Sequence, residues 1–121
     1  MARILVVDDD PDILALVRLK LEACGHDVRT APDGEAGLAA ARAEHPDLVV
    51  ADWMMPRLTG PQMLAQMRAD PATATIRFIL LTARAQEAQE SGIDGFVAKP
   101  FSLADLAAGV DAVLARGRSG A

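Results

Sequence analysis

The sequence is poor in the residues that cross-link proteins or bind soft metals. It contains one cysteine, Cys24, and two histidines, His26 and His45, which are far apart in the chain. A single cysteine excludes an internal disulfide, and without clustered histidines a zinc site of the Cys/His type is also excluded. We expect Cys24 to be a core thiol and both histidines to lie in loops. Any metal ion would have to be held by oxygen atoms.

Long hydrophobic runs and excess positive charge are also missing. The apolar run at residues 4–7 ends in three aspartates, so it is too short for a secretory signal or a membrane span. The chain has 12 basic and 17 acidic residues and a formal net charge of −5. A nucleic-acid-binding protein typically carries a basic cluster and a net positive charge, and this chain has neither. We therefore expect a cytoplasmic domain that contacts neither nucleic acid nor membrane directly.

The apolar runs that are present alternate with helical segments. Short runs at 4–7, 48–51, 78–81 and 96–98, with a weaker one at 28–31, predict buried parallel strands. Between them, Asp10-Pro11 is a helix-start signal, and residues 35–44 form an Ala-rich segment with high helix propensity. Pro61 can start a further helix, and Ser102 with Asp105 resembles a capping box. Five βα units predict one α/β domain with a doubly wound parallel sheet over residues 1–116. Residues 117–121 are expected to form a flexible tail or the start of a linker.

Four of these predicted strands end in polar residues. The first runs into Asp8 and Asp9, and the others into Asp52, Thr82 and Lys99. Ligand sites of open α/β sheets lie beyond the carboxyl ends of the strands, so these side chains should gather in one place. Asp8 and Asp9 taken alone are more typical of turn and cap residues, as Asp10 and Asp12 are expected to be. The joint occurrence in four elements favours a functional site.

The chemistry of these side chains suits phosphoryl transfer. Each pair of carboxylates 4 Å apart costs about 4 kcal/mol at an effective dielectric constant of about 20, so the cluster needs cations. Mg²⁺ prefers a few carboxylates with water and phosphate oxygens, and Lys99 adds a positive charge. Asp52 stands alone at a strand end and is the best candidate for an acceptor nucleophile. Thr82 and Lys99 could contact the oxygens of the transferred group.

These residues together match a family. Four segments resemble, in order, the motifs of the receiver domain of two-component response regulators. They are Val6-Val7-Asp8-Asp9, residues 52–56 with Gly60, residues 81–83 and residues 99–101. The resemblance implies a flavodoxin-like sheet of order 2-1-3-4-5 and a cis peptide bond at Lys99-Pro100. It implies a phosphoacceptor switch, not an enzyme, which assists its own phosphorylation and dephosphorylation. Asp52 would receive the phosphoryl group from a histidine kinase, a phosphotransfer protein or a small acyl phosphate.

The resemblance also assigns roles around the acceptor. It implies that Asp9, Asp52 and the backbone carbonyl of Met54 hold Mg²⁺ directly and that Asp8 holds it through water. In the family, the signal passes through a threonine and an aromatic residue, here Thr82 and Phe96. Phe96 lacks the hydroxyl of the more usual tyrosine, and the alternative for it is a plain core residue. Met54, Ala83 and Arg84 occupy positions that tune the lifetime of the phosphoryl group.

One segment departs from the family. Only 16 residues, 83–98, separate Thr82 from Lys99, which is shorter than usual by about a turn and a half of helix. We expect a shortened fourth helix at residues 85–91, which is marginal without packing. In the family, this region commonly forms the surface that binds partners and the second copy of a dimer. We expect an output partner or effector domain, which the sequence does not identify, and a phosphorylation-dependent homodimer is an alternative form of output.

Three other functions fit parts of the pattern. An aspartate-nucleophile phosphohydrolase of the haloacid dehalogenase type would use Asp8, because Asp8-x-Asp10 mimics its first motif, but its later acid pair and cap domain are missing. A flavin-binding module would need a hydroxyl-rich phosphate loop where the sequence is acidic. A receiver that no longer requires phosphorylation is the fourth possibility, and the presence of all site residues disfavours it.

Overall fold

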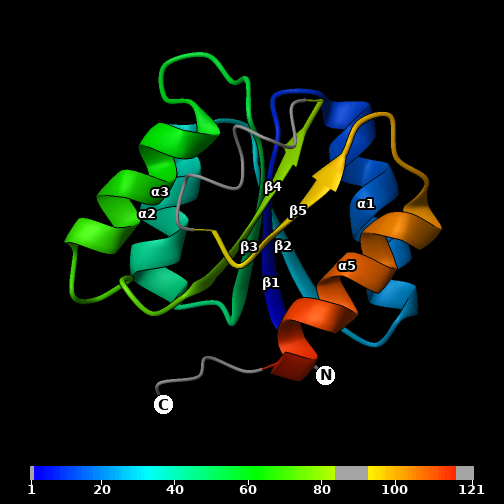
Figure 1. Ribbon diagram of the computed structural model, residues 1–121. Helices are drawn as coiled ribbons and strands as arrows, with labels where there is room; N and C mark the ends of the chain where they lie inside the picture. Colours follow the sequence, from blue (N-terminus) through cyan, green and yellow to red (C-terminus); the bar gives the residue numbers. More distant parts are fainter. Residues whose placement is uncertain (1, 84–92, 117–121) are drawn as a thin grey trace.

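The structure is a computed structural model that describes residues 2–83 and 93–116 of the 121-residue chain. The predicted fourth helix at 85–91, the modulating position Arg84 and the predicted tail at 117–121 lie outside the described residues. The elements are β1 (Arg3–Val7), α1 (Pro11–Ala23), β2 (Asp27–Ala31), α2 (Gly34–Glu44), β3 (Leu48–Asp52), α3 (Gly60–Ala69), β4 (Arg77–Thr82), β5 (Gly95–Ala98) and α5 (Leu103–Arg116). From β1 to β4, strands and helices alternate as the sequence predicts, and β5 and α5 follow the segment that is not described (Figure 1).

The five strands form one parallel sheet of order β2-β1-β3-β4-β5. This order confirms the predicted doubly wound, flavodoxin-like class. The register aligns the carboxyl ends of the central strands, because Val7 pairs with Ala51, Asp52 with Leu81, and Thr82 with Ala98. Polar residues at these ends therefore meet along one edge of the sheet, the upper edge in Figure 1.

Helices cover both faces of the sheet, with α2 and α3 on one side and α1 and α5 on the other (Figure 1). Successive side chains of a strand point to opposite faces, so every central strand is apolar at consecutive positions. In β1, Leu5 and Val7 join the cluster on the α2/α3 side, whereas Ile4 and Val6 join the cluster on the α1/α5 side. The sheet thus carries two separate cores.

Side chains at the helix starts satisfy the free backbone N–H groups there. The Asp10 carboxylate accepts hydrogen bonds from the first turn of α1, which confirms its predicted cap role. Ser102 and Asp105 exchange the hydrogen bonds of the predicted capping box. A second capping box, Thr59 with Gln62, begins α3 and was not predicted. No helix in the described ranges is long and apolar enough to span a bilayer.

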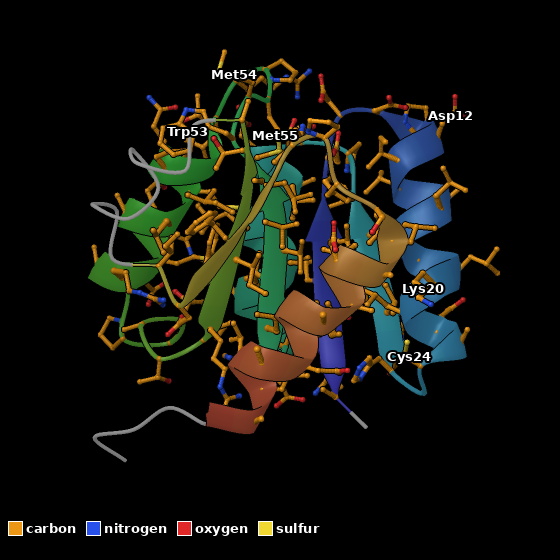
Figure 2. The ribbon with its side chains drawn as sticks, turned by 45° about the vertical axis from the view of Figure 1, so that its right-hand side comes forward. Asp12, Lys20, Cys24, Trp53, Met54 and Met55 are labelled. Atoms are coloured by element: carbon orange, nitrogen blue, oxygen red, sulfur yellow. The ribbon has the colours of Figure 1, made fainter. Side chains whose placement is uncertain are left out.

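Two predicted side-chain environments differ in the structure. Cys24 is exposed, so its assignment as a core thiol is wrong. It follows the last residue of α1, where the buried stripe has already ended at Leu21, and it lies at the opposite end of that helix from Asp12 (Figure 2). Phe96 is partly exposed and belongs to neither core cluster, whereas Val97, the next residue of β5, is buried in the α1/α5-side core. The plain-core alternative for Phe96 is therefore wrong.

Candidate functional site

The ends of β1 and β3 bring the predicted acidic residues together. Asp52 is the last residue of β3, and Asp8 directly follows β1, whose Val7 is paired with Ala51. Asp8 and Asp52 are buried residues, with 2% and 7% of their surfaces exposed, whereas Asp9 is exposed. One carboxylate oxygen from each of the three aspartates lies within 4.8 Å of the other two. Hard oxygen donors at this spacing are suited to a divalent cation.

Asp8 has a second, structural contact. Its Oδ1 accepts a hydrogen bond of 2.9 Å from the backbone N–H of Asp10, and so it also shapes the turn between β1 and α1. Asp8 is thus both a turn residue, as its position after the strand alone predicts, and a member of the acidic cluster. Its second carboxylate oxygen remains available for water or a cation.

The environment makes the Asp8 carboxylate difficult to ionise. Burial, aided by the nearby Asp52 and Asp9 carboxylates, raises the pKa of Asp8 from 3.8 to about 6. The hydrogen bond from the Asp10 N–H and the Lys99 ammonium lower the pKa but do not offset the burial. A cation placed among the aspartates would favour the charged form of Asp8.

Lys99 and Thr82 complete the opposite side of the cluster. The backbone N–H of Lys99 donates to the carbonyl of Thr82 at 2.8 Å, which fixes the exit of β5 beside the end of β4. The Lys99 ammonium pairs with Asp52 Oδ1, and its side chain is 38% exposed. Thr82 is buried at the end of β4. The Lys99–Pro100 peptide bond is cis, as the resemblance implies.

A close backbone approach holds the end of β3 in place. The N–H of Gly60 donates to the carbonyl of Trp53 at 2.9 Å, and the N–H of Trp53 donates to Leu81 at 3.0 Å. A Cβ atom at Gly60 would lie 2.6 Å from the backbone oxygen of Asp52, so only glycine fits there without displacement. The sequence contains this glycine in a family motif, but its contact with Asp52 is visible only in three dimensions.

Two clefts meet at the cluster. One, of about 780 Å³, extends from the three aspartates between α1 and the segment after β5; the other, of about 450 Å³, lies beside Trp53, Met54 and Thr82. Asp52 and Lys99 line both clefts, as does Ala83. A small ligand entering from solvent can therefore reach the Asp52 carboxylate from either side.

The predicted modulating positions lie around this opening. Met54 is 69% exposed, and Figure 2 shows it beyond the ends of the strands, whereas neighbouring Met55 is buried. Ala83 is exposed and has no polar side chain to compete for a ligand. Trp53 is partly buried against the α2/α3-side core, next to Asp52.

Comparison with known proteins gives a consistent picture. The profile "Response regulator receiver domain" matches residues 4–111. The transcriptional regulator RpaA of Synechocystis sp., which is described as DNA-binding, is 40% identical over 96% of this chain and 50% of its own length. The protein PilH of Pseudomonas aeruginosa is 38% identical over 95% of this chain and 99% of its own length. The chain spans about half the length of RpaA and of several other regulators that it matches.

A solved structure shows the same architecture with a metal ion. The receiver domain of a sensor histidine kinase from Pseudomonas aeruginosa, solved with magnesium coordinated in its active-site cleft, superposes with a TM-score of 0.81. It is 28% identical in sequence, and the match covers 88% of this chain and 92% of that one.

Proposed function

Because the chain belongs to the response regulator receiver domain family, whose members are phosphoacceptor signalling modules rather than turnover enzymes, we propose that Asp52 is its phosphoacceptor. One observation carries the proposal. The end of β3 places the Asp52 carboxylate among two further carboxylates and the Lys99 ammonium, at an edge open to solvent. Family membership implies a histidine kinase as partner, and a phosphotransfer protein or a small acyl phosphate is the alternative donor.

The chain's own residues account for the chemistry of the transfer. A carboxylate oxygen of Asp52 attacks the phosphorus of the donor; with phosphohistidine, the P–N bond breaks, the imidazole takes up a proton, and an acyl phosphate forms. Lys99, now paired with Asp52, is positioned to pair with a phosphoryl oxygen as a point charge. The Thr82 hydroxyl at the adjacent strand end can donate to another oxygen.

Asp8, Asp9 and Asp52 are the proposed ligands of Mg²⁺, with the backbone carbonyl of Met54 as the ligand implied by the family resemblance. Their donor chemistry fits, since all are hard oxygen atoms and the three carboxylates lie close enough to share one ion. The bound ion would neutralise the oxygens of the transferring group. Three carboxylates with one ammonium leave two negative charges, which one divalent cation balances. The magnesium in the Pseudomonas receiver domain supports this assignment.

The output of the switch is proposed to pass through Thr82 and Phe96. Thr82 lies beside the acceptor, and Phe96 is only partly buried, so its side chain has room to change rotamer. The DNA-binding named for RpaA belongs to a protein about twice as long. The net charge of −5 argues against direct binding of nucleic acid by this domain itself. We propose that it acts in the cytoplasm on a partner or effector domain. Homodimerisation on phosphorylation is one route for this output.

The test is phosphorylation by a small acyl phosphate in the presence of Mg²⁺, followed by intact-mass and peptide mass spectrometry. We expect a mass gain of one phosphoryl group, located on Asp52 and lost in Asp52→Asn. Asp10→Asn is the matched control at the same edge, since asparagine still caps α1, and it should be phosphorylated. A phosphoryl group retained in Asp52→Asn would contradict the proposal. Multiple-turnover phosphate release that depends on Asp8 would instead support the phosphohydrolase alternative.

A further inference from the structure

The methionines of the described chain differ sharply in access to solvent. Met54 is 69% exposed, whereas Met55 is 6% exposed and Met63 and Met67 are fully buried. Figure 2 shows Met54 at the edge of the sheet, beyond the strand ends. Oxidation of a thioether requires contact between the sulfur and a dissolved oxidant, so exposure decides which methionine reacts. The buried three provide internal references for Met54.

Met54 also lies where a change in polarity would affect the acceptor. It lines the cleft of about 450 Å³ together with Asp52, Thr82 and Lys99. The remaining lining residues Trp53, Leu81 and Ala83 are mainly apolar. The Met54 thioether is only a weak hydrogen-bond acceptor, so in its reduced form it offers little for water to bind at this cleft.

We propose that Met54 is an oxidation site through which a peroxide shortens the lifetime of the phosphoryl group on Asp52; this rests on the proposed function. The sulfur donates an electron pair to one oxygen of hydrogen peroxide, an S–O bond forms, and the O–O bond breaks. Sulfur is oxidised by two electrons, and the other peroxide oxygen leaves as water. The product is a methionine sulfoxide, which a methionine sulfoxide reductase can convert back.

The sulfoxide changes the cleft because its oxygen is a strong hydrogen-bond acceptor. At the opening of the cleft, the sulfoxide oxygen binds and orients a water molecule close to the acyl phosphate. Water is the molecule that hydrolyses this bond. The interaction gained is about that of one ordinary hydrogen bond, so the expected acceleration of dephosphorylation is about two- to tenfold. Oxidation would thus turn off the phosphorylated state without the kinase.

The first part of the test maps oxidation without any phosphorylation. The chain is prepared as Cys24→Ser, because Cys24 is an exposed thiol that peroxide would also oxidise. After exposure of the folded protein to hydrogen peroxide, peptide mass spectrometry should find sulfoxide at Met54 well before Met55, Met63 or Met67. In urea, all four should react alike. Equal rates in the folded protein would overturn the proposal.

The second part compares dephosphorylation rates of each variant before and after peroxide. The unoxidised and oxidised parent should differ by about two- to tenfold, and a sulfoxide reductase should restore the original rate. Met54→Leu should show no response to peroxide, whereas Met55→Leu should respond like the parent. An oxidised parent with an unchanged or longer lifetime would overturn the inference alone. Failure of the unoxidised protein to form any acyl phosphate would instead overturn the proposed function.

Discussion

At the scale of single residues, the pKa of Asp8 links the site to stability. The pKa of this carboxyl is about 6 in the folded chain and 3.8 as its ordinary value. The folded state therefore binds a proton more tightly, and the resulting stabilisation is complete below about pH 4 and is lost as the pH rises through about 6. A shift of this size corresponds to about 2–3 kcal/mol of unfolding free energy.

We predict that Asp8→Asn is more stable than the parent by about 1–3 kcal/mol near pH 7.5 without divalent ions, and that the difference shrinks near pH 5. The asparagine oxygen can still accept the hydrogen bond from the Asp10 N–H. Urea unfolding at the two pH values in a chelating buffer measures the change. Asp9→Asn is the control, because Asp9 is exposed and its neutralisation should matter less. An Asp8→Asn variant no more stable than the parent near pH 7.5 would disprove this explanation.

At the scale of elements, the junction of β3 with α3 depends on Gly60. Its Cα hydrogen faces the backbone oxygen of Asp52 and the Leu80 side chain, and an added Cβ would lie 2.6 Å from each. We predict that Gly60→Ala lowers the unfolding free energy by about 1–3 kcal/mol and slows phosphorylation by displacing Asp52. Denaturant unfolding and the phosphodonor assay measure the two effects.

Gly109→Ala is the matched control for this prediction. It lies inside α5, and its new Cβ would approach only the Val97 side chain, at 3.1 Å. Alanine also gains about 1 kcal/mol of helix propensity there, so the net change should be small. Equal losses of stability in Gly60→Ala and Gly109→Ala would contradict a special role for the contact with Asp52.

The base of β5 is held by an ion pair that links α3 to the sheet. Arg68 donates to Asp94 Oδ2 at 3.1 Å and to the carbonyls of Ala74 and Ile76 at 3.1 and 2.6 Å. Asp94 Oδ2 also accepts from the N–H of Phe78 at 2.8 Å. Both side chains of the pair are less than one-quarter exposed. Asp94 precedes β5 and Lys99 follows it, so the ion pair fixes the strand at the end away from the site.

We predict that Asp94→Ala costs about 2–3 kcal/mol of unfolding free energy, because it leaves a half-buried guanidinium and a backbone N–H without this partner. Glu22→Ala, in the exposed Arg18–Glu22 pair, should cost only about 0.5 kcal/mol. Urea unfolding compares the variants, and a double-mutant cycle with Arg68→Ala isolates the pair. A loss at Asp94 no larger than at Glu22 would show that burial does not strengthen this interaction.

At the scale of the whole molecule, the sequence predicts what depends on local pattern. Consecutive apolar residues predict the central strands, and the aligned ends of parallel strands place Asp8, Asp52 and Lys99 together. The sequence does not reveal contacts between distant segments: no local pattern indicates that Arg68 reaches Asp94, or that Gly60 contacts the oxygen of Asp52. Cys24 was wrongly predicted to be a core residue because the apolar periodicity of the sequence extends to Cys24, whereas the helix ends at Ala23.

The site also belongs to the whole fold, since its carboxylates come from two strands that pair only in the folded sheet. A cation bound only by the folded chain raises the unfolding free energy by about 2.7 kcal/mol at about 100 times its Kd. We therefore predict that saturating Mg²⁺ raises Tm by about 10 °C. Thermal unfolding followed by the fluorescence of Trp53, the single tryptophan, measures the shift beside the site itself.

Variants at the acidic cluster test whether this stabilisation comes from the site. In Asp9→Asn and Asp52→Asn, a ligand charge is lost and the rise in Tm should fall by more than half, whereas Asp10→Asn should keep it, because Asp10 acts on α1. The increase in Tm caused by Mg²⁺ should be larger at about pH 7.5 than at about pH 5, because the ion competes with the proton that burial favours on Asp8. A Mg²⁺ effect that is equal in all three variants would place the ion elsewhere on this acidic chain.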